Sequence, residues 1–360
     1  MRHISRPLGG PCCILLAASL WGTTGTARTF APAGATPVAV GAARIIGGGM
    51  LLFLLALRGG ALRGLITRGT RTRCLLAISA AAAAASQAAF FTAIARTGVA
   101  VGTAVTIGAA PVFTGILSLI TGQGNRPGAR WLTATAAAVA GCAMLITSGH
   151  TSTASAVGIA LALAASFCYA VYAVTASYLI TNGAEDHAVV GAIFGGAAIL
   201  LLPVLFTSAM SWAATGHGLA VATYLAVLTT TLPYLLYARG LRTTPVTTAT
   251  TLGLAEPAAA AILGLTMLGE HLTATGLAGL GLLAISLATL AWPSHRLTTA
   301  ARPASEQHQP RDGAPNRCHI RPGQQMSTAP APGRPAVGPP PSGHPMIPAW
   351  PKHADRQHRP

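Results

Sequence analysis

Residues 96–111 read RTGVAVGTAVTIGAAP, and residues 242–257 read RTTPVTTATTLGLAEP. Both stretches begin with arginine and threonine, continue with small residues and threonine, and end in a proline. Each lies within a long apolar run, so the likeness indicates that the chain contains two copies of one unit. Pro111 and Pro257 fall near the middle of these runs, and we expect an interrupted helix at both places.

The composition is that of a chain surrounded mostly by lipid. Of the 360 residues, 52% are hydrophobic and only 8% are charged, and the mean hydropathy is +0.56. A soluble domain carries about 25% charged residues, so this chain has too little polar surface to cover a globule of its length. The net charge of +16 does not indicate nucleic acid, because the arginines gather in loops and in the tail. We expect a membrane protein with no nucleic-acid partner.

Cysteine and histidine give no sign of a metal site. The six cysteines include no CxxC pair, and the eleven histidines form no HExxH or HxxxH pair. The sequence also has no Walker A loop for ATP. We expect no metal, no cofactor and no enzymatic activity.

Ten apolar runs are long enough to cross a bilayer, which takes roughly 20 residues. They are expected at 11–30, 37–57, 74–95, 97–121, 131–148, 156–180, 188–208, 218–238, 245–268 and 274–292. The first run resembles a signal peptide, but nine more runs follow it, which favours a retained helix. The sequence therefore predicts an all-α polytopic membrane protein with ten transmembrane helices.

The arginines give this chain an orientation. If the N-terminus is cytoplasmic, the loops on that side hold Arg2, Arg6, Arg58, Arg63, Arg68, Arg71, Arg73, Arg126, Arg130, Arg239 and Arg242. The other side holds Arg96, with Arg28 near that end of the first helix. Positive residues favour the cytoplasmic side. We expect a multi-pass protein in the bilayer of the cell (inner) membrane, with a cytoplasmic N-terminus and C-terminus.

Two copies with five helices each enter the membrane from opposite sides, because five is odd. They are therefore expected to form inverted repeats related by a pseudo-two-fold axis in the membrane plane. Similar small-residue runs at 40–48 and 190–196 support this division. The expected parts are a cytoplasmic N-terminus at 1–10, the two five-helix repeats at 11–148 and 156–292, and a disordered, basic, proline-rich cytoplasmic tail at 293–360.

Glu256 is the sharpest candidate for chemistry. It lies about 11 residues into the ninth predicted helix, and it is the only acidic residue deep within any of the ten. A charge at that depth costs on the order of 2.5–3.5 kcal/mol, so such a residue persists where it faces a cavity or a partner. Burial disfavours the charged form of a carboxyl group, which suits Glu256 to bind a proton. The alternative is a structural carboxylate paired with an arginine.

Three further side chains are candidates for binding a substrate. Arg44 lies about seven residues inside the second predicted helix. It could attract an anionic group, pair with Glu256, or extend to the membrane surface. Trp21 and Tyr169 occupy similar places in the two copies, and their aromatic faces suit an amphipathic or cationic substrate as well as ordinary packing.

The two central prolines are candidates for gating. Each leaves a carbonyl acceptor without its N–H partner, on Ile107 and on Gly253. Unpaired backbone groups at membrane depth are tolerated beside a wet cavity or a protein neighbour. We expect helix kinks at Pro111 and Pro257 that approach the same central cavity.

Two tyrosines of the eighth predicted helix, Tyr234 and Tyr237, lie toward its cytoplasmic end. Tyrosine is enriched at membrane–water interfaces, so we expect this pair to belong to an interfacial belt.

Several motifs resemble those of one family, the EamA-type members of the drug/metabolite transporter superfamily. Leu20-Trp21-Gly22 is similar to the family's first-helix signature, and Ala43-Arg44 to its second-helix arginine. The most specific resemblance is Glu256-Pro257 followed by LGEHLT at 268–273 and by Gly279. The chain departs from the family pattern at TGQG (121–124), Gly276 and Ser286.

The resemblance covers about residues 11–292 and implies ten helices in inverted five-helix repeats. It also implies export of amino acids, other small metabolites or toxic compounds, often driven by an ion gradient. We expect a secondary active transporter of a small-molecule substrate that works by alternating access, with H+ as a candidate coupling ion. The alternatives are a membrane-embedded enzyme or ligand-binding protein without transport, and a passive channel. The substrate and the oligomeric state do not follow from these patterns.

Overall fold

The computed structural model describes residues 9–123, 128–147, 155–207, 210–267, 269, 271 and 273–292. Every secondary-structure element within these described residues is a helix. The predicted tail at 293–360 lies outside them, as do Arg2, Arg6 and Arg126.

The first half contains five long helices and a short connecting turn. The long helices are α1 (Gly10–Thr29), α2 (Pro37–Leu57), α4 (Thr70–Thr97), α5 (Val99–Ile120) and α6 (Ala129–Thr147). Between α2 and α4 lie the 3-10 turn η1 (Arg58–Gly60) and the short helix α3 (Ala61–Ile66).

The second half also contains five spans, two of which are divided. They are α7 (Ala156–Thr181), α8 (Asp186–Thr207), the eighth span α9–η3–α10 (Gly216–Ala226, Val227–Thr231, Leu232–Leu241), the ninth span α11–α12 (Val246–Leu252, Ala255–Met267) and α13 (Ala274–Ala291). A short 3-10 turn, η2 (Ser211–Ala214), precedes α9. Among the described residues, eight segments are long and apolar enough to cross a membrane, and Ala129–Leu145 is a shorter apolar helix.

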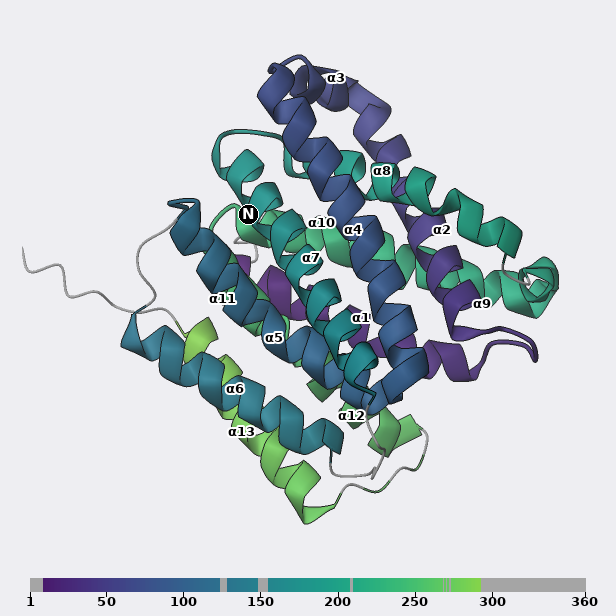
Figure 1. The fold of residues 1–360 in the computed structure, drawn as a ribbon, viewed down its shortest axis with the longest axis vertical. Helices are drawn as coiled ribbons and strands as arrows, with labels where there is room; N and C mark the ends of the chain where they lie inside the picture. Colours follow the sequence, from purple (N-terminus) through teal and green to yellow (C-terminus); the bar gives the residue numbers. More distant parts are fainter. Residues whose placement is uncertain are drawn as a thin grey trace, which may run out of the picture. The chain divides into compact units, whose positions relative to one another are not determined.

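The helix contacts repeat when the two halves are exchanged. The second span packs on the seventh (α2 on α8) and the fifth on the tenth (α6 on α13), as Figure 1 shows for the adjacent pair α6 and α13. The third span packs on the sixth (α4 on α7), and its counterpart, the eighth, packs on the first (α10 on α1). Likewise the fourth span packs on the sixth (α5 on α7), and the ninth packs on the first (α12 on α1). Five spans per half reverse the direction of the second unit, so the predicted inverted repeat is confirmed.

Glycine allows the symmetric helix pairs to approach closely. A Cβ atom added to Gly141 of α6 would lie 2.7 Å from the carbonyl oxygen of Gly279 in α13, and one added to Gly279 would lie 2.6 Å from that of Gly141. Small residues at such crossings are typical of helices that pack within a membrane. The fifth and tenth spans therefore meet through matching surfaces.

The buried core lies between the two halves. Its largest fully buried side chains include Ile14 and Ile45 from the first half and Phe194 and Leu241 from the second. All four belong to one continuous hydrophobic cluster. The repeats therefore share one core.

The predicted interruption occurs in only one of the two copies. The ninth span breaks at Gly253 and Leu254, and Pro257 is the third residue of α12, where a backbone N–H has no helical partner to lose. In the first copy, α5 continues through Pro111, which lies inside the helix. The prediction of an interrupted helix is therefore wrong for the first copy, because a single missing bond at Pro111 does not end a long apolar helix.

Candidate functional site

A cavity of about 100 Å³ lies between the two repeats, with space for several water molecules. Helices of both halves line it. The lining residues are Trp21, Arg44, Ser86, Gln87, Phe90, Thr106, Ile107, Ala110, Tyr169, Tyr172, Tyr234, Thr250, Gly253 and Glu256.

The four residues predicted to bind substrate or a proton all line this cavity. Trp21, Arg44, Tyr169 and Glu256 come from α1, α2, α7 and α12, which are far apart in the sequence. The predicted gating prolines are the chain neighbours of two lining residues, Ala110 and Glu256. The structure thus brings the candidates together, while their roles stay predictions.

Glu256 lies at the start of a helix that begins inside the membrane-spanning bundle. It is the second residue of α12, and its backbone N–H donates to the carbonyl of Gly253 at 3.0 Å. The partial positive charge of a helix N-terminus stabilises a carboxylate. Within the described ranges no side chain makes a hydrogen bond or ion pair to this carboxylate, although the charge of Arg44 acts on it. The break in the ninth span therefore provides a favourable electrostatic position for Glu256.

Arg44 is held inside the bundle by neutral partners. Its Nε donates to Thr230 Oγ1 at 3.2 Å, and its Nη1 donates to Thr24 Oγ1 at 3.4 Å. Tyr234 lines the same cavity as this guanidinium. These bonds direct the half-buried side chain toward the eighth span and α1, and among the described residues Arg44 makes no direct ion pair with Glu256. A guanidinium and a carboxylate therefore share the cavity without being joined.

Aromatic side chains form one wall of the cavity. The ring of Trp21 lies 5.2 Å from that of Tyr234 and 5.6 Å from that of Tyr237, and the Tyr169 hydroxyl donates to that of Tyr237 at 3.3 Å. Tyr234 and Tyr237 are only 4% and 3% exposed, so their predicted place in an interfacial belt is wrong. The reason is tertiary, because α1 packs over this face of α10.

Gly22 explains how α1 approaches the helix that carries Glu256. A Cβ atom at Gly22 would lie 2.6 Å from the Glu256 carbonyl oxygen and 2.7 Å from the Ala259 Cβ. The adjacent Trp21 lines the cavity. In this dipeptide one residue therefore forms the wall and the other allows the close helix contact.

Several polar lining residues were missed in the sequence. The hydroxyl of Ser86 donates to the Ala165 carbonyl at 2.8 Å, and that of Thr106 donates to the Ala162 carbonyl at 3.2 Å, so both join the first repeat to α7. Gln87 follows an alanine run and is the only amide side chain within α4. That isolated amide was the available signal for a cavity beside this helix.

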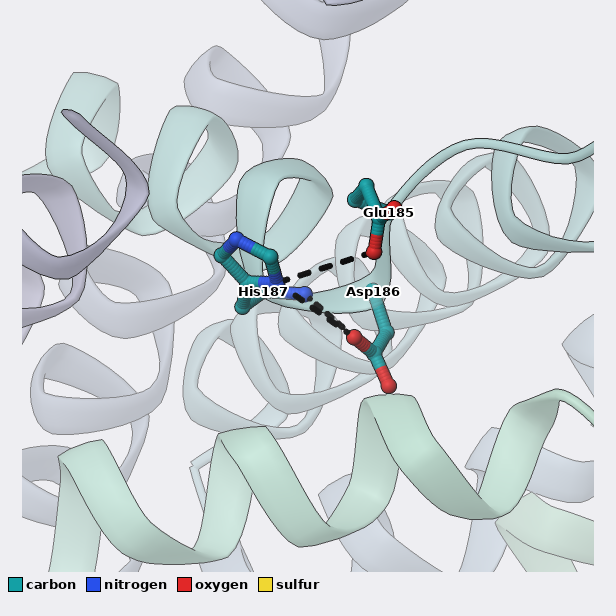
Figure 2. A group of neighbouring side chains, drawn as sticks. All are labelled: Glu185, Asp186 and His187. Carbon is teal, nitrogen blue, oxygen red and sulfur yellow. Dashed lines mark hydrogen bonds and ion pairs between the residues drawn. The ribbon is translucent and has the colours of Figure 1, made fainter. Parts of the chain in front are cut away.

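A second polar cluster lies at the end of the bundle where α8 begins. Glu185, Asp186 and His187 place potential metal-ligand atoms within 4.8 Å of one another (Figure 2). However, Arg242 already pairs with both acids, with its Nε 2.8 Å from Asp186 Oδ2 and its Nη2 3.6 Å from Glu185 Oε2. The cluster therefore acts as an ion-pair bridge between the α7–α8 loop and the residue that follows α10.

Comparison with known proteins agrees with this architecture. Residues 8–147 and 156–292 each match the EamA-like transporter family. An uncharacterized transporter, YwfM of Bacillus subtilis, is 34% identical over 291 residues, which cover 80% of this chain and 95% of YwfM. The threonine/homoserine exporter RhtA of Salmonella typhimurium is 39% identical over 137 residues, covering 37% of this chain and 44% of RhtA.

A solved crystal structure shares the fold, with a TM-score of 0.64 at 18% identity over 78% of this chain and 95% of that one. The family matches fall on the two five-helix halves that surround the cavity. The chain therefore belongs to the EamA-like transporter family and is a multi-pass membrane transporter of the drug/metabolite transporter kind.

Proposed function

We propose that this protein is a secondary active transporter that exports an amino acid or a similar small metabolite. Access to the cavity would alternate between the two sides of the cell membrane as one repeat rocks against the other. The observation that carries the proposal is the pair of opposite charges, Arg44 and Glu256, that line one cavity without a direct ion pair between them.

Two separated charges of opposite sign suit a zwitterion. An amino acid presents a carboxylate, which Arg44 can bind with a fork of N–H donors. It also presents an ammonium group, whose N–H groups can donate hydrogen bonds to the Glu256 carboxylate. The exporter RhtA, to which part of this chain is similar, is named for threonine and homoserine. A proton on Glu256 would compete with the ammonium group, which would couple substrate movement to a proton gradient.

The arginine pattern supports a cytoplasmic position for both termini. Arg68, predicted on that side, donates to the backbone carbonyls of Asn182 and Gly183 in the α7–α8 loop. Arg242, predicted on the same side, pairs with Asp186 beside that loop. These residues gather at one end of the bundle, which we propose faces the cytoplasm of the cell (inner) membrane.

Proton-coupled flux in proteoliposomes tests the proposal. The protein would be reconstituted with a pH-sensitive dye inside, and L-threonine or pools of other amino acids and metabolites would be added. We expect wild type to accumulate a substrate against its gradient with a proton flux, and Glu256→Gln to lose the coupled flux. Glu185→Gln is the matched control, because it makes the same change at an exposed site outside the cavity.

Each outcome separates the proposal from its alternatives. Equal proton flux in wild type and Glu256→Gln would exclude Glu256 as the coupling carboxylate. Equilibration without accumulation would instead indicate a passive channel. Saturable binding with no movement of any pool would indicate a ligand-binding protein that does not transport.

A further inference from the structure

The eighth span contains a π-helical turn in the middle of the bundle. This turn, η3, covers Val227–Thr231, and its residues Thr229, Thr230 and Thr231 are all buried. Pro233 follows two residues later and has no N–H to donate to the helical turn before it. Wide turns of this kind are rare in helices and occur frequently at functional sites.

The three threonine hydroxyls satisfy the backbone of the wide turn. Thr229 Oγ1 donates to the Leu225 carbonyl at 2.8 Å, Thr230 Oγ1 donates to the same carbonyl at 3.0 Å, and Thr231 Oγ1 donates to the Ala226 carbonyl at 2.9 Å. Each hydroxyl has a single proton. Since that proton is used by the backbone, each oxygen is left as an acceptor with a fixed direction.

This turn fits tightly against α2. A Cβ atom at Gly48 would lie 2.4 Å from the Thr230 Cγ2, and one at Gly47 would lie 3.0 Å from the Ala226 Cβ. The Thr231 hydroxyl also lies 3.2 Å from the Gly48 carbonyl oxygen. Two adjacent glycines therefore allow η3 and the last residue of α9 to lie directly against the helix that carries Arg44.

Of these three hydroxyls, only that of Thr230 accepts a hydrogen bond from Arg44 within the part of the chain that the structure describes. Arg44 Nε donates to it at 3.2 Å, and Arg44 Nη1 donates to Thr24 at 3.4 Å. A guanidinium has five N–H donors in one plane. With Nε and Nη1 bonded to threonines of the two repeats, the plane is fixed while further N–H donors stay available.

We propose that Thr230 is a positioning residue that, together with Thr24, orients the Arg44 guanidinium to receive the carboxylate of the substrate. The proposal rests on the proposed function, since it assigns the end of the cavity that binds the anionic group. A planar fork binds a carboxylate strongly only when both groups lie in one orientation. The π-helical turn therefore contributes to substrate selection without contacting the substrate.

Transport kinetics with a matched pair of probes test this role. L-Threonine carries the carboxylate, and L-threoninamide replaces it with a neutral amide. In proteoliposomes, Thr230→Val is expected to raise the KM for L-threonine about tenfold, the usual size of a hydrogen bond to a charged group. The KM for L-threoninamide and the maximal rates should change less than about twofold, because the lost orientation matters only for carboxylate binding.

Two further variants separate positioning from folding. Thr230→Ser keeps the hydroxyl and should restore the wild-type KM for L-threonine. Thr229→Val makes the same change at the neighbouring buried threonine. Within the described residues, the hydroxyl of Thr229 bonds only to the Leu225 carbonyl. The KM ratio of this variant for the two probes should match that of wild type.

A spectroscopic readout makes the test independent of the substrate. In protein labelled with 15N at arginine Nε, the Arg44 Nε–H signal is assigned by its loss in Arg44→Lys. Its exchange with water should be slow in wild type and in Thr229→Val, and about tenfold faster in Thr230→Val because the hydrogen bond is gone.

The two readouts distinguish failure of this inference from failure of the proposed function. Unchanged Nε–H exchange in Thr230→Val would overturn the positioning role. An equal rise in KM for both probes would overturn the assignment to carboxylate binding. If folded wild type transports neither probe, the proposed substrate class is overturned. The exchange measurement would then test only the positioning of Arg44.

Discussion

The fourth and ninth spans occupy equivalent places in the two repeats, yet the fourth is a continuous helix and the ninth is broken. In the fourth, α5 runs without a break, and Ala110 lines the cavity just before Pro111. In the ninth, the helix stops and restarts, and Glu256 lines the cavity just before Pro257. The carboxylate is thus found where a new helix N-terminus stabilises negative charge.

The same division extends to the charges of the whole bundle. Residues 1–184 contain no aspartate or glutamate, so the first repeat can supply only the cationic member of the pair, Arg44. The second repeat supplies Glu256 and the break that accommodates it. Duplication has therefore kept the packing symmetric while the polar groups at the centre have become specialised.

The largest stability difference between these spans is expected at their prolines. Pro111→Ala restores an N–H that can bond to the Ile107 carbonyl, and it should raise the free energy of unfolding by about 1–3 kcal/mol. Pro257→Ala should change it by less than about 1 kcal/mol, because a first-turn N–H gains no helical partner. Unfolding in mixed micelles titrated with SDS measures both.

Pro233→Ala is not a suitable control, because that proline directly follows the π-helical turn, in the first turn of α10. Wild type and Thr266→Ala therefore serve as references. Thr266 is exposed near the end of α12, and its hydroxyl bonds only to its own helix in the described structure. Equal gains at Pro111 and Pro257 would mean that the ninth span behaves as one continuous helix in the membrane, contrary to the break between α11 and α12.

Much of the fold could be predicted because it follows from patterns that the whole chain repeats. Apolar runs give the spans, and the likeness of residues 96–111 and 242–257 gives the duplication. Glu256 and Arg44 were recognisable because charge is expensive at membrane depth.

Other features could not be predicted, because they depend on which helices meet. Tyr234 and Tyr237 carry an interfacial signal, and only the packing of α1 on α10 buries them. The π-helical turn at Thr230 depends on its contact with Gly48 of α2, which no local pattern reveals. The asymmetry between Pro111 and Pro257 likewise comes from the loss of helical structure two residues upstream of α12, at Gly253.

The next effect concerns two small residues at equivalent positions of α1 and α7. Gly22 lies at the contact of α1 with α12, and Ala170, which follows Tyr169 as Gly22 follows Trp21, is fully buried in α7. Gly22→Ala should destabilise the protein by about 1–3 kcal/mol, because its new methyl group meets the backbone of Glu256.

Ala170→Gly should cost about 0.5–1 kcal/mol, the usual helix penalty for glycine. Thermal unfolding in detergent, followed by gel filtration, gives the ranking of the two variants. A larger loss for Ala170→Gly than for Gly22→Ala would show that the close contact at Gly22 does not limit side-chain size there as the structure indicates.

The smallest expected effects lie at the starts of the second and seventh spans. Thr36 caps α2 by accepting a bond from the Ala39 N–H at 3.2 Å, and this neutral contact should contribute about 1 kcal/mol. At the start of α8, Asp186 instead accepts from the His187 N–H at 2.8 Å and pairs with Arg242. Asp186→Asn should cost at most about 1 kcal/mol, since Arg242 is half exposed to solvent.

These two contributions differ more in their dependence on salt than in their size. Raising NaCl to about 1 M reduces the Debye length to about 3 Å, so the penalty of Asp186→Asn should shrink while that of Thr36→Ala stays constant. Chelation by EDTA should leave the unfolding of wild type unchanged, because Arg242 rather than a cation neutralises the acidic pair. A loss of stability with EDTA would instead identify the Glu185–Asp186–His187 cluster as a metal site and add a third difference between the repeats.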